Sequence, residues 1–329
     1  MKEYNSKYNK KAILLVNLGT PDSFDIKDIR KYLKQFLSDK RVVEANPILW
    51  WFILNLIILP IRSKRTAKLY KKIWNQDSNK SPLLLYTESL AKKLNDNLDG
   101  YIVDFAMRYG NPSINSKIKY LQSQGATDIT ILPLYPQYSG STTASVYDEV
   151  YKCLSNLRWQ PNIKGIKPYY DNDHHIEAVK SQILEHLQQI DFKADVILFS
   201  FHGIPKEYFD AGDPYYCHCH KTYRLVKESL QDKLTGTEFE LSFQSRFGPK
   251  KWLEPYTTDK LIEYAKSGKN IVIVAPGFAT DCLETLEELA IREKEVFKDN
   301  GGKNFSLVPC LNDSEAHLEM LKNIILVEG

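Results

Sequence analysis

Short runs of apolar, mostly β-branched residues alternate along the chain with longer stretches of helical periodicity. Seven of these runs have the length of a buried strand: 12–16, 101–106, 129–132, 196–199, 239–243, 271–275 and 305–308. Uninterrupted apolar runs of this length are typical of parallel strands that are covered on both faces. The alternation predicts an α/β fold, with a mostly parallel sheet flanked by helices on both faces.

The ends of some predicted strands repeat between the first and second parts of the chain. Two runs lead into a Gly-x-Pro sequence, at Gly19–Pro21 and at Gly203–Pro205, and the strand ends at 131–136 and 273–278 form a second pair. Any α/β protein contains strand ends of this kind, but their repetition favours two similar halves joined near 159–167, with a cleft between them.

This repetition also predicts the division of the chain. We expect an N-terminal half over 1–160, which includes an apolar lip at 47–61, and a C-terminal half over 161–310. The remaining residues, 311–329, should form a C-terminal helix that packs back on the N-terminal half.

The lip is the most apolar segment of the chain. It includes Trp50, Trp51 and Phe52, and basic residues flank it on both sides. The apolar stretch from 47 to 60 is shorter than the roughly 20 residues that a membrane-spanning helix needs, so we expect it not to cross a bilayer. Paired tryptophans with basic flanks favour a hairpin or short helix that docks on a membrane surface. The alternative is an ordinary buried helix.

Composition narrows the class of protein. The chain has 329 residues, of which 43% are hydrophobic, and this is enough to form the hydrophobic core of one large domain or of two domains of ordinary size. Its net charge is +3. This charge is too small and too dispersed to indicate a nucleic-acid partner. The polar, lysine-rich start lacks the features of a signal peptide, and the five cysteines form no disulfide framework, so we expect a cytoplasmic protein.

Candidate chemistry lies at two predicted strand ends. His202 ends one apolar run, and Asp281, Glu284 and Glu288 follow another at helical spacing. Because ligands bind outside the carboxyl ends of parallel strands, these groups should face one crevice and could bind a divalent metal or transfer protons. A lone histidine at a strand end is more often structural, and acidic residues often cap helices.

Cysteine and histidine alternate at Cys217–His220. Thiolates and imidazoles bind zinc, but this spacing lacks the usual two-residue separation, which favours a loop at a surface or pocket rim over a metal site.

Aromatic and hydroxyl residues are concentrated near the remaining strand ends, in 135–143 and 243–252. Rings such as Trp252 could contact the faces of a flat aromatic ligand, and Arg108 or Arg246 could bind its carboxylates. Core packing explains any single ring, but the set favours a ligand site.

Several of these motifs, in this order, resemble those of the ferrochelatase family over nearly the whole chain. The matching segments are 17–21, 108–109, 135–139 with 141–143, 200–205, 212–215, 244–249 with Trp252, and 281–289. The resemblance implies two Rossmann-like, chelatase-type halves around a porphyrin cleft. It also implies an enzyme that inserts Fe(II) into protoporphyrin IX to form protohaem, the terminal step of haem biosynthesis.

The resemblance implies roles for individual residues. His202 and Glu284 would be the catalytic pair and the iron ligands, and Glu288 and Asp281 would continue a path for protons or metal. The porphyrin-binding residues would be Leu18, Thr20, Arg108, Tyr109, Tyr138, Ser139, Arg246 and Trp252. Removal of two pyrrole protons requires a base and a distorted macrocycle, and the sequence leaves open whether His202 or Glu284 is that base.

The chain departs from the family pattern at some positions, and no family role is assigned to those positions. Members with a [2Fe–2S] cluster carry a cysteine where this chain has Gly140, together with C-terminal cysteines, and no cysteine follows Cys310. We therefore expect Fe(II) as a substrate and no [2Fe–2S] cluster. Some members have histidine where Cys282 stands, so no role is transferred to that position.

Other functions remain open at this point. The chain could act on another tetrapyrrole such as coproporphyrin, insert cobalt, or bind porphyrin or metal without turnover. The hydrophobic lip favours the less carboxylated protoporphyrin, with peripheral contact at the inner face of the membrane.

Overall fold

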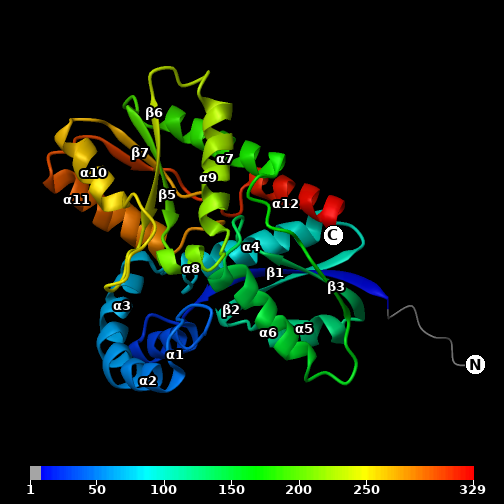
Figure 1. Ribbon diagram of the computed structural model, residues 1–329. Coiled ribbons are helices and arrows are strands. Elements are labelled where there is room, and N and C mark those ends of the chain that lie inside the picture. Colours follow the sequence, from blue (N-terminus) through cyan, green and yellow to red (C-terminus); the bar gives the residue numbers. More distant parts are fainter. Residues whose placement is uncertain (1–8) are drawn as a thin grey trace, which may run out of the picture. The chain divides into compact units, whose positions relative to one another are not determined.

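The structure is a computed structural model that describes residues 9–329, which form two compact units (Figure 1). The first unit contains the chain up to Tyr135, Gly140–Lys167 and Leu321–Gly329, and the second contains Pro136–Ser139 and Pro168–Met320. Each unit has one four-stranded sheet, and every strand pair is parallel. The prediction of parallel sheets flanked by helices is confirmed.

The two sheets have the same strand order. In the first unit it is β2 (Tyr101–Gly110), β1 (Lys10–Thr20), β3 (Ala126–Pro133), β4 (Asn162–Gly165). In the second it is β6 (Glu238–Gln244), β5 (Val196–His202), β7 (Ile271–Val274), β8 (Phe305–Leu307). The strand ends that repeat in sequence belong to β1 and β5 and to β3 and β7, which occupy equivalent places, so the prediction of two similar halves is confirmed.

Helices connect the strands of both units. Those of the first unit are α1 (Ile26–Leu37), α2 (Pro47–Phe52), η1 (Ile53–Ile58), α3 (Leu59–Ile73), α4 (Pro82–Asn97), α5 (Ile114–Ser123), η2 (Gly140–Ala144) and α6 (Ser145–Leu154). Those of the second are α7 (Asp173–Gln189), α8 (Lys206–Asp210), α9 (Tyr215–Leu230), α10 (Thr257–Lys266), η3 (Glu284–Glu293) and α11 (Lys294–Asp299). The last helix, α12 (Glu315–Glu328), begins in the second unit and ends in the first.

β4 is the one strand of the described residues that the hydrophobic pattern missed. The sequence analysis placed 159–167 in a linker, but Asn162–Gly165 pairs with β3 at the edge of the sheet. Its residues are exposed or half-buried, because an edge strand here contributes little to the core. A strand without an apolar run gives no signal in an analysis of apolar runs.

Both faces of each central strand are buried. In the first unit Ala12, Leu14 and Val16 pack in one cluster with the inner faces of α5 and α6. The intervening Ile13 and Leu15 are equally buried, because successive side chains of a strand point to opposite faces. This explains why β1 appears in the sequence as an unbroken apolar run.

The core of the second unit is built in the same way. One cluster joins Val196 and Leu198 of β5 to Ile271 and Ile273 of β7, with side chains of α10, η3 and α11 packed against them. On the other side of β5 the ring of Phe199 lies edge-on to Tyr223 of α9, with centroids 5.3 Å apart. The strands are therefore fixed from both sides, and so are their carboxyl ends.

The lip differs from its prediction in form. The segments α2, η1 and α3 form one continuous helix of 27 residues from Pro47 to Ile73. Pro60 cannot donate a backbone hydrogen bond and would normally interrupt a helix. The π-helical turn η1 directly before it, in which Leu59 N bonds Leu54 O, accommodates this proline, so the helix continues beyond the expected end.

This 27-residue helix meets the length and composition of a membrane-crossing helix, and only 17% of its most apolar window is buried. The length argument made from 47–60 alone is therefore wrong. One face of the helix nevertheless carries the buried residues Leu54, Leu59, Ser63, Ala67 and Tyr70. Tyr70 lies edge-on to Tyr32 of α1, with ring centroids 6.4 Å apart, so this face packs on the first unit.

Candidate active site

His202 is the last residue of β5 in the second unit, as its position after an apolar run predicted. It pairs in register with Gln244, the last residue of β6. Its half-buried ring lies between two aromatic rings, with centroids 6.5 Å from Trp252 and 6.5 Å from Phe278. The imidazole is thus held at the carboxyl edge of the sheet, where α/β folds bind ligands.

The backbone determines which nitrogen of His202 is basic. Nδ1 lies 2.6 Å from the carbonyl oxygen of Gly203, and a carbonyl only accepts hydrogen bonds, so Nδ1 carries the proton. Nε2 then keeps its lone pair. In this tautomer the side chain can accept a proton or bind a metal ion through Nε2.

Glu284 lies at the same edge of the second sheet. It is the first residue of η3 and is half-buried. The side-chain amide of Gln244, the register partner of His202, donates to the backbone carbonyl of Glu284 over 3.2 Å. Gln244 therefore links the strand end of His202 to the backbone of Glu284.

The predicted helix after β7 forms, but as a π-helix. It runs from Glu284 to Glu293 and begins three residues later than Asp281. Hydrogen bonds of a π-helix join residues i and i+5, and such turns occur frequently at functional sites. The expected face of three carboxylates at α-helical spacing is therefore reduced to Glu284 and Glu288.

Asp281 is buried in a network before this helix begins. Its Oδ1 accepts from Thr285 Oγ1 at 2.9 Å and its Oδ2 accepts from Asn312 Nδ2 at 2.7 Å. The backbone nitrogen of Asp281 donates to Asn312 Oδ1 at 2.7 Å. Both carboxylate oxygens thus hold the start of the helix to the segment before α12.

Glu288 lies one turn along η3 and is 8% exposed. Its Oε2 accepts a 2.6 Å hydrogen bond from Ser245 Oγ and lies 3.7 Å from the guanidinium of Arg292. Ser245 has a left-handed backbone conformation (φ 66°), which is unusual for a residue with a side chain. This strained residue, next to Gln244, holds Glu288 close to the edge that carries Glu284.

Trp252 packs closely against the strand end that carries His202. A Cβ atom on Gly203 would lie 2.9 Å from the carbonyl oxygen of Gln244 and 3.1 Å from the indole ring, so only glycine fits there. The buried indole nitrogen of Trp252 has no hydrogen-bond partner among the described residues. Arg246 is exposed and stacks on the ring of Tyr256 at 4.8 Å.

Tyr138 and Ser139 belong to the second unit, although they follow β3 in the chain. Ser139 is buried and donates to Asp213 Oδ2 over 2.8 Å. The backbone nitrogen of Tyr138 donates to His218 Nδ1 over 3.2 Å, and the Tyr138 side chain is half-buried. Of the predicted set, His202, Glu284, Glu288, Tyr138, Ser139, Arg246 and Trp252 therefore all lie in one unit.

The first unit carries the other predicted residues at the carboxyl ends of β1 and β2. Gly19 pairs in register with Tyr109, and a Cβ atom on Gly19 would lie 1.7 Å from the carbonyl oxygen of Tyr109. Gly19 also has a φ of 107°, so no other residue fits. Leu18 is half-buried on one side of this glycine, and Thr20 is buried on the other.

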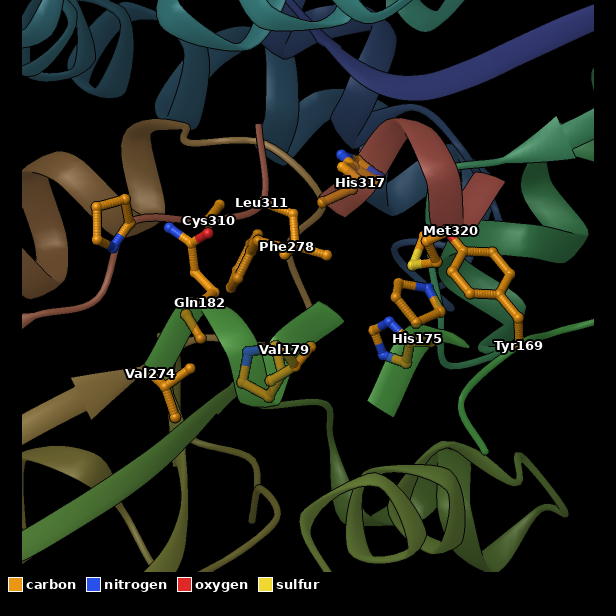
Figure 2. A pocket seen from close by; sticks show the side chains of 15 residues that line it. Tyr169, His175, Val179, Gln182, Val274, Phe278, Cys310, Leu311, His317 and Met320 are labelled. Carbon is orange, nitrogen blue, oxygen red and sulfur yellow. The ribbon is translucent and has the colours of Figure 1, made fainter. Parts of the chain in front are cut away.

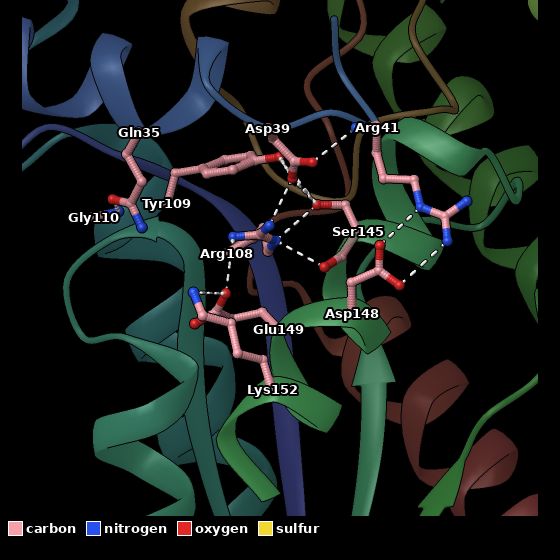
Figure 3. Close-up of polar contacts among 10 residues, drawn as sticks. All are labelled: Gln35, Asp39, Arg41, Arg108, Tyr109, Gly110, Ser145, Asp148, Glu149 and Lys152. Atoms are coloured by element: carbon pink, nitrogen blue, oxygen red, sulfur yellow. Dashed lines mark hydrogen bonds and ion pairs between the residues drawn. The ribbon is translucent and has the colours of Figure 1, made fainter. Parts of the chain in front are cut away.

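Arg108 and Tyr109 belong to a polar network that Figure 3 shows in detail. The guanidinium of Arg108 lies 2.6 Å from Asp39 Oδ2, and both side chains are about nine-tenths buried. Tyr109 Oη and Ser145 Oγ donate to the same oxygen at 2.7 and 2.6 Å. Asp39 thus compensates the charge of Arg108 within the first unit.

The network shifts the acid–base behaviour of Asp39. Burial pushes the pKa of this carboxyl upwards, but hydrogen bonds from Ser145 and Tyr109 and the charge of Arg108 favour its ionised form. The pKa of Asp39 is lowered on balance. The loop that leads to the lip is therefore anchored by an ionised carboxylate.

The second unit contains a small cavity, and Phe278, whose ring centroid lies 6.5 Å from that of His202, is among its lining residues (Figure 2). It has a volume of about 20 Å³, which is room for water and far too little for a porphyrin. Its lining includes Tyr169, His175 and His317, all buried, and Nε2 of His317 and both ring nitrogens of His175 have no hydrogen-bond partner among the described residues.

Within residues 9–329 no three or more histidine, cysteine, aspartate or glutamate side chains are grouped closely enough to hold a metal ion. The alternating pairs at Cys217–His220 lie on α9, where Cys219 is buried and Cys217 exposed.

Sequence reasoning missed three residues that position the candidate groups. Gln244 is the link between His202 and Glu284, Asp39 compensates Arg108, and His218 holds Tyr138. Gln244 could have been predicted from the sequence, because His202 and Gln244 are the last residues of two adjacent parallel strands. The other two contacts join residues 69 and 80 positions apart and left no local signal.

Comparison with known proteins identifies the family of this chain. The family model described as Ferrochelatase matches residues 10–328. A curated protein named "Ferrochelatase" from Francisella tularensis subsp. novicida is 70% identical over 325 residues, which cover 99% of this chain and 98% of that protein. Another of the same name, from Francisella tularensis subsp. holarctica, shares the same identity and coverage.

Solved structures show the fold at low identity. SirB from Bacillus subtilis with Fe3+ has a TM-score of 0.58 at 13% identity and covers 97% of this chain, with 95% of its own length matched. CbiX, described as the terminal enzyme for biosynthesis of sirohaem in denitrifying bacteria, has a TM-score of 0.54 at 11% identity, with 96% of this chain and 98% of its own length covered. With its paired parallel sheets and a family match over almost its entire length, this chain belongs to the ferrochelatase family.

Proposed function

We propose that this protein inserts Fe(II) into protoporphyrin IX and so forms protohaem, the terminal step of haem biosynthesis. The observation that carries the proposal is the family match over residues 10–328, together with a tautomer of His202 that leaves the lone pair of Nε2 free at the sheet edge that Gln244 connects to Glu284. Fe(II) and the porphyrin enter as substrates. The products are the iron porphyrin and the two protons that leave the pyrrole nitrogens.

In the proposed mechanism the porphyrin lies against the sheet edge that carries His202. One of the two groups, Nε2 of His202 or the carboxylate of Glu284, accepts a pyrrole proton, and the other binds the incoming iron or accepts the second proton. Which of the two acts as base stays a prediction. Glu288 extends the acidic surface, whereas the hydrogen bonds of Asp281 favour a positioning role for that carboxylate.

The porphyrin contacts are proposed on the same basis. The exposed guanidinium of Arg246 is available to a porphyrin carboxylate, and the half-buried indole of Trp252 offers a flat aromatic surface. Arg108 is already paired with Asp39, so a carboxylate would have to compete for it. Leu18, Thr20, Tyr109, Tyr138 and Ser139 stay predicted contacts.

We also propose that the protein is cytoplasmic and that its lip contacts the inner face of the membrane peripherally. Support comes from exposed apolar side chains on the helix, whose exposed fractions lie between 51% and 73%: Ile48, Leu49, Trp51, Phe52, Leu56, Ile57 and Ile61. Exposed lysines and arginines follow in α3: Lys64, Arg65, Lys68, Lys71 and Lys72. Apolar residues next to basic ones fit an anionic membrane surface. No nucleic acid takes part in this proposal.

The proposal includes no [2Fe–2S] cluster. Cysteine ligation of such a cluster takes four thiolates, and Cys153, Cys219, Cys282 and Cys310 are buried with their thiol pKa values raised by burial. The purified protein should contain no stoichiometric iron and sulfide. Analysis that found two irons and two sulfides per chain would contradict this part.

The function is tested with purified protein, Fe(II) and protoporphyrin IX without oxygen. We expect catalytic formation of protohaem, and His202→Ala should lower turnover by about two orders of magnitude or more, since a general base contributes that much. The control is His174→Ala, at an exposed histidine of α7.

Parallel assays separate the alternatives. Faster turnover with coproporphyrin or with Co(II) would point to another chelatase, and stoichiometric binding without turnover to a binding protein. Near wild-type turnover of His202→Ala would remove the role proposed for that side chain.

A further inference from the structure

Three consecutive residues after β3 are each held by the first part of α9 or by the turn before it. Gln137 Nε2 donates to Thr222 Oγ1 over 3.0 Å, the Tyr138 nitrogen donates to His218 Nδ1 over 3.2 Å, and Ser139 Oγ donates to Asp213 Oδ2 over 2.8 Å. His218 and Thr222 are four residues apart, so they lie on one face of the helix. The segment 137–139 is therefore docked at three successive points.

The middle contact depends on the protonation of His218. A backbone N–H only donates, so Nδ1 of His218 must accept with its lone pair, and the ring proton is on Nε2. A doubly protonated imidazolium has no lone pair and would place an N–H against the N–H of Tyr138. The other two contacts do not change when this ring titrates.

The ring of His218 is also fixed in orientation. It stacks on Tyr170 with centroids 3.6 Å apart and planes 11° from parallel. Thr222 in turn donates to the carbonyl oxygen of Tyr170 at 2.7 Å. Nδ1 is therefore aimed at the backbone of Tyr138 by packing as well as by its own hydrogen bond.

We propose that His218 is a positioning residue for the porphyrin: its neutral imidazole holds the backbone of Tyr138, and protonation of the ring releases that residue. The inference rests on the proposed function, in which Tyr138 and Ser139 contact the porphyrin. It assigns a role to one residue of the Cys217–His220 motif other than binding metal.

The surroundings of His218 determine when this change occurs. Burial lowers the pKa of the ring, while Asp171, in the loop before α7, and Asp213, in the turn before α9, raise it. The ring of Tyr170 and the backbone of Tyr138 also face it. Burial outweighs the two carboxylates, so the pKa lies below the ordinary value of about 6.5 and the contact is intact at neutral pH.

Two substitutions separate the acceptor from the ring. His218→Asn keeps an oxygen on Cγ, where Nδ1 stands, and does not titrate. His218→Phe keeps a ring that can stack on Tyr170 but removes the acceptor. Porphyrin binding is followed by fluorescence from pH 8 to pH 4.5, with circular dichroism to verify that each variant is folded, and kcat and KM are measured at pH 8.

We expect wild type and His218→Asn to bind alike at pH 8, and His218→Phe to bind about two- to tenfold more weakly, as for the loss of one hydrogen bond. As the pH is lowered towards 4.5, porphyrin binding by wild type should weaken relative to His218→Asn and approach that of His218→Phe. At pH 8 the phenylalanine variant should raise KM and leave kcat within twofold.

Equal binding by wild type and His218→Phe at pH 8 would overturn the positioning role. A wild-type pH profile that follows His218→Asn down to pH 4.5 would overturn release by protonation. The matched control pair, His174→Asn and His174→Phe, should follow wild type at every pH. If wild type itself neither binds porphyrin nor inserts iron, the proposed function has failed rather than this inference.

Discussion

Individual histidines of the second unit have opposite environments. His202 is half-buried with its Nδ1 bonded to a carbonyl oxygen, whereas His175 and His317 are buried in the small cavity. Burial lowers the pKa of His175 to about 3, and the neighbouring His317 contributes to the shift. Burial also lowers the pKa of His317 to about 4. Both rings are therefore neutral in the folded protein well below the pH at which an exposed histidine becomes charged.

This difference predicts acid sensitivity. An unfolded chain protonates these rings near pH 6.5 and the folded chain does not until pH 3–4, so the unfolded state binds more protons in between. The contribution of these two rings to the free energy of unfolding is fully present above about pH 6.5. It should fall with decreasing pH by up to about 1.4 kcal/mol per pH unit for each ring. Urea denaturation between pH 7.5 and 4.5 measures the slope.

The replacement His175→Leu should reduce the slope of the free energy of unfolding against pH by the amount that corresponds to one bound proton, about 1.4 kcal/mol per pH unit. The replacement His174→Leu, at the exposed neighbour, should leave the slope unchanged. An unchanged slope for His175→Leu would show that this ring is not the group that titrates.

At the scale of elements, the helix from Pro47 to Ile73 combines two environments. One face packs on the first unit through Leu54, Leu59 and Tyr70, and the other exposes a series of large apolar side chains. About 40 Å of helix, at 1.5 Å per residue, is held along one side by these contacts. A helix anchored in this way would lie along a membrane rather than cross it.

Exchange of exposed lip residues for serine should therefore weaken binding to anionic vesicles. We expect Trp51→Ser, Phe52→Ser and Ile57→Ser together to reduce the bound fraction in sedimentation by about tenfold or more, because large apolar area is lost from the membrane interface. Trp50 is excluded, since its indole nitrogen donates to the carbonyl oxygen of Leu37.

The control replaces two equally exposed apolar residues outside the lip, Leu326→Ser and Val327→Ser, and should sediment like wild type. Equal sedimentation of the lip variant and wild type would exclude this segment as the membrane-binding surface.

Elements with an apolar signal could be predicted, and those without one could not. β1 and β5 are buried on both faces and appear as continuous apolar runs, but β4 is an exposed edge strand. A helix near Glu284 was predicted from the spacing of its acidic residues. That spacing does not distinguish a π-helix from an α-helix, so the π-helical form could not be predicted. His202 and Glu284 could be located because the end of a strand is also the edge of a sheet. The partner of Arg108 could not, because Asp39 lies 69 residues away.

At the scale of the whole molecule, the end of the chain completes the first unit. Leu321, Ile324 and Ile325 of α12 are buried, and Lys164 of β4 and Lys167 just after it donate hydrogen bonds to Gly329 and Glu328. The first unit thus depends on residues that are synthesised after the second unit.

Deletion of residues 321–329 should prevent stable folding of the first unit. Loss of three buried aliphatic side chains costs more than about 5 kcal/mol, which is comparable with the stability of a whole domain. Urea denaturation monitored by near-UV circular dichroism measures the effect, and the variant Leu326→Ser/Val327→Ser should remain close to wild type. A truncated chain with unchanged stability would contradict this account.

The shared strand order has a consequence for how the two units came to differ. Aligned on their Gly-x-Pro turns, Leu18 of β1 takes the position that His202 takes in β5. If one ancestral unit was duplicated, a single inherited position became aliphatic in one copy and an imidazole in the other. Between its first and second strands, the first unit also carries the segment from which the lip helix is made.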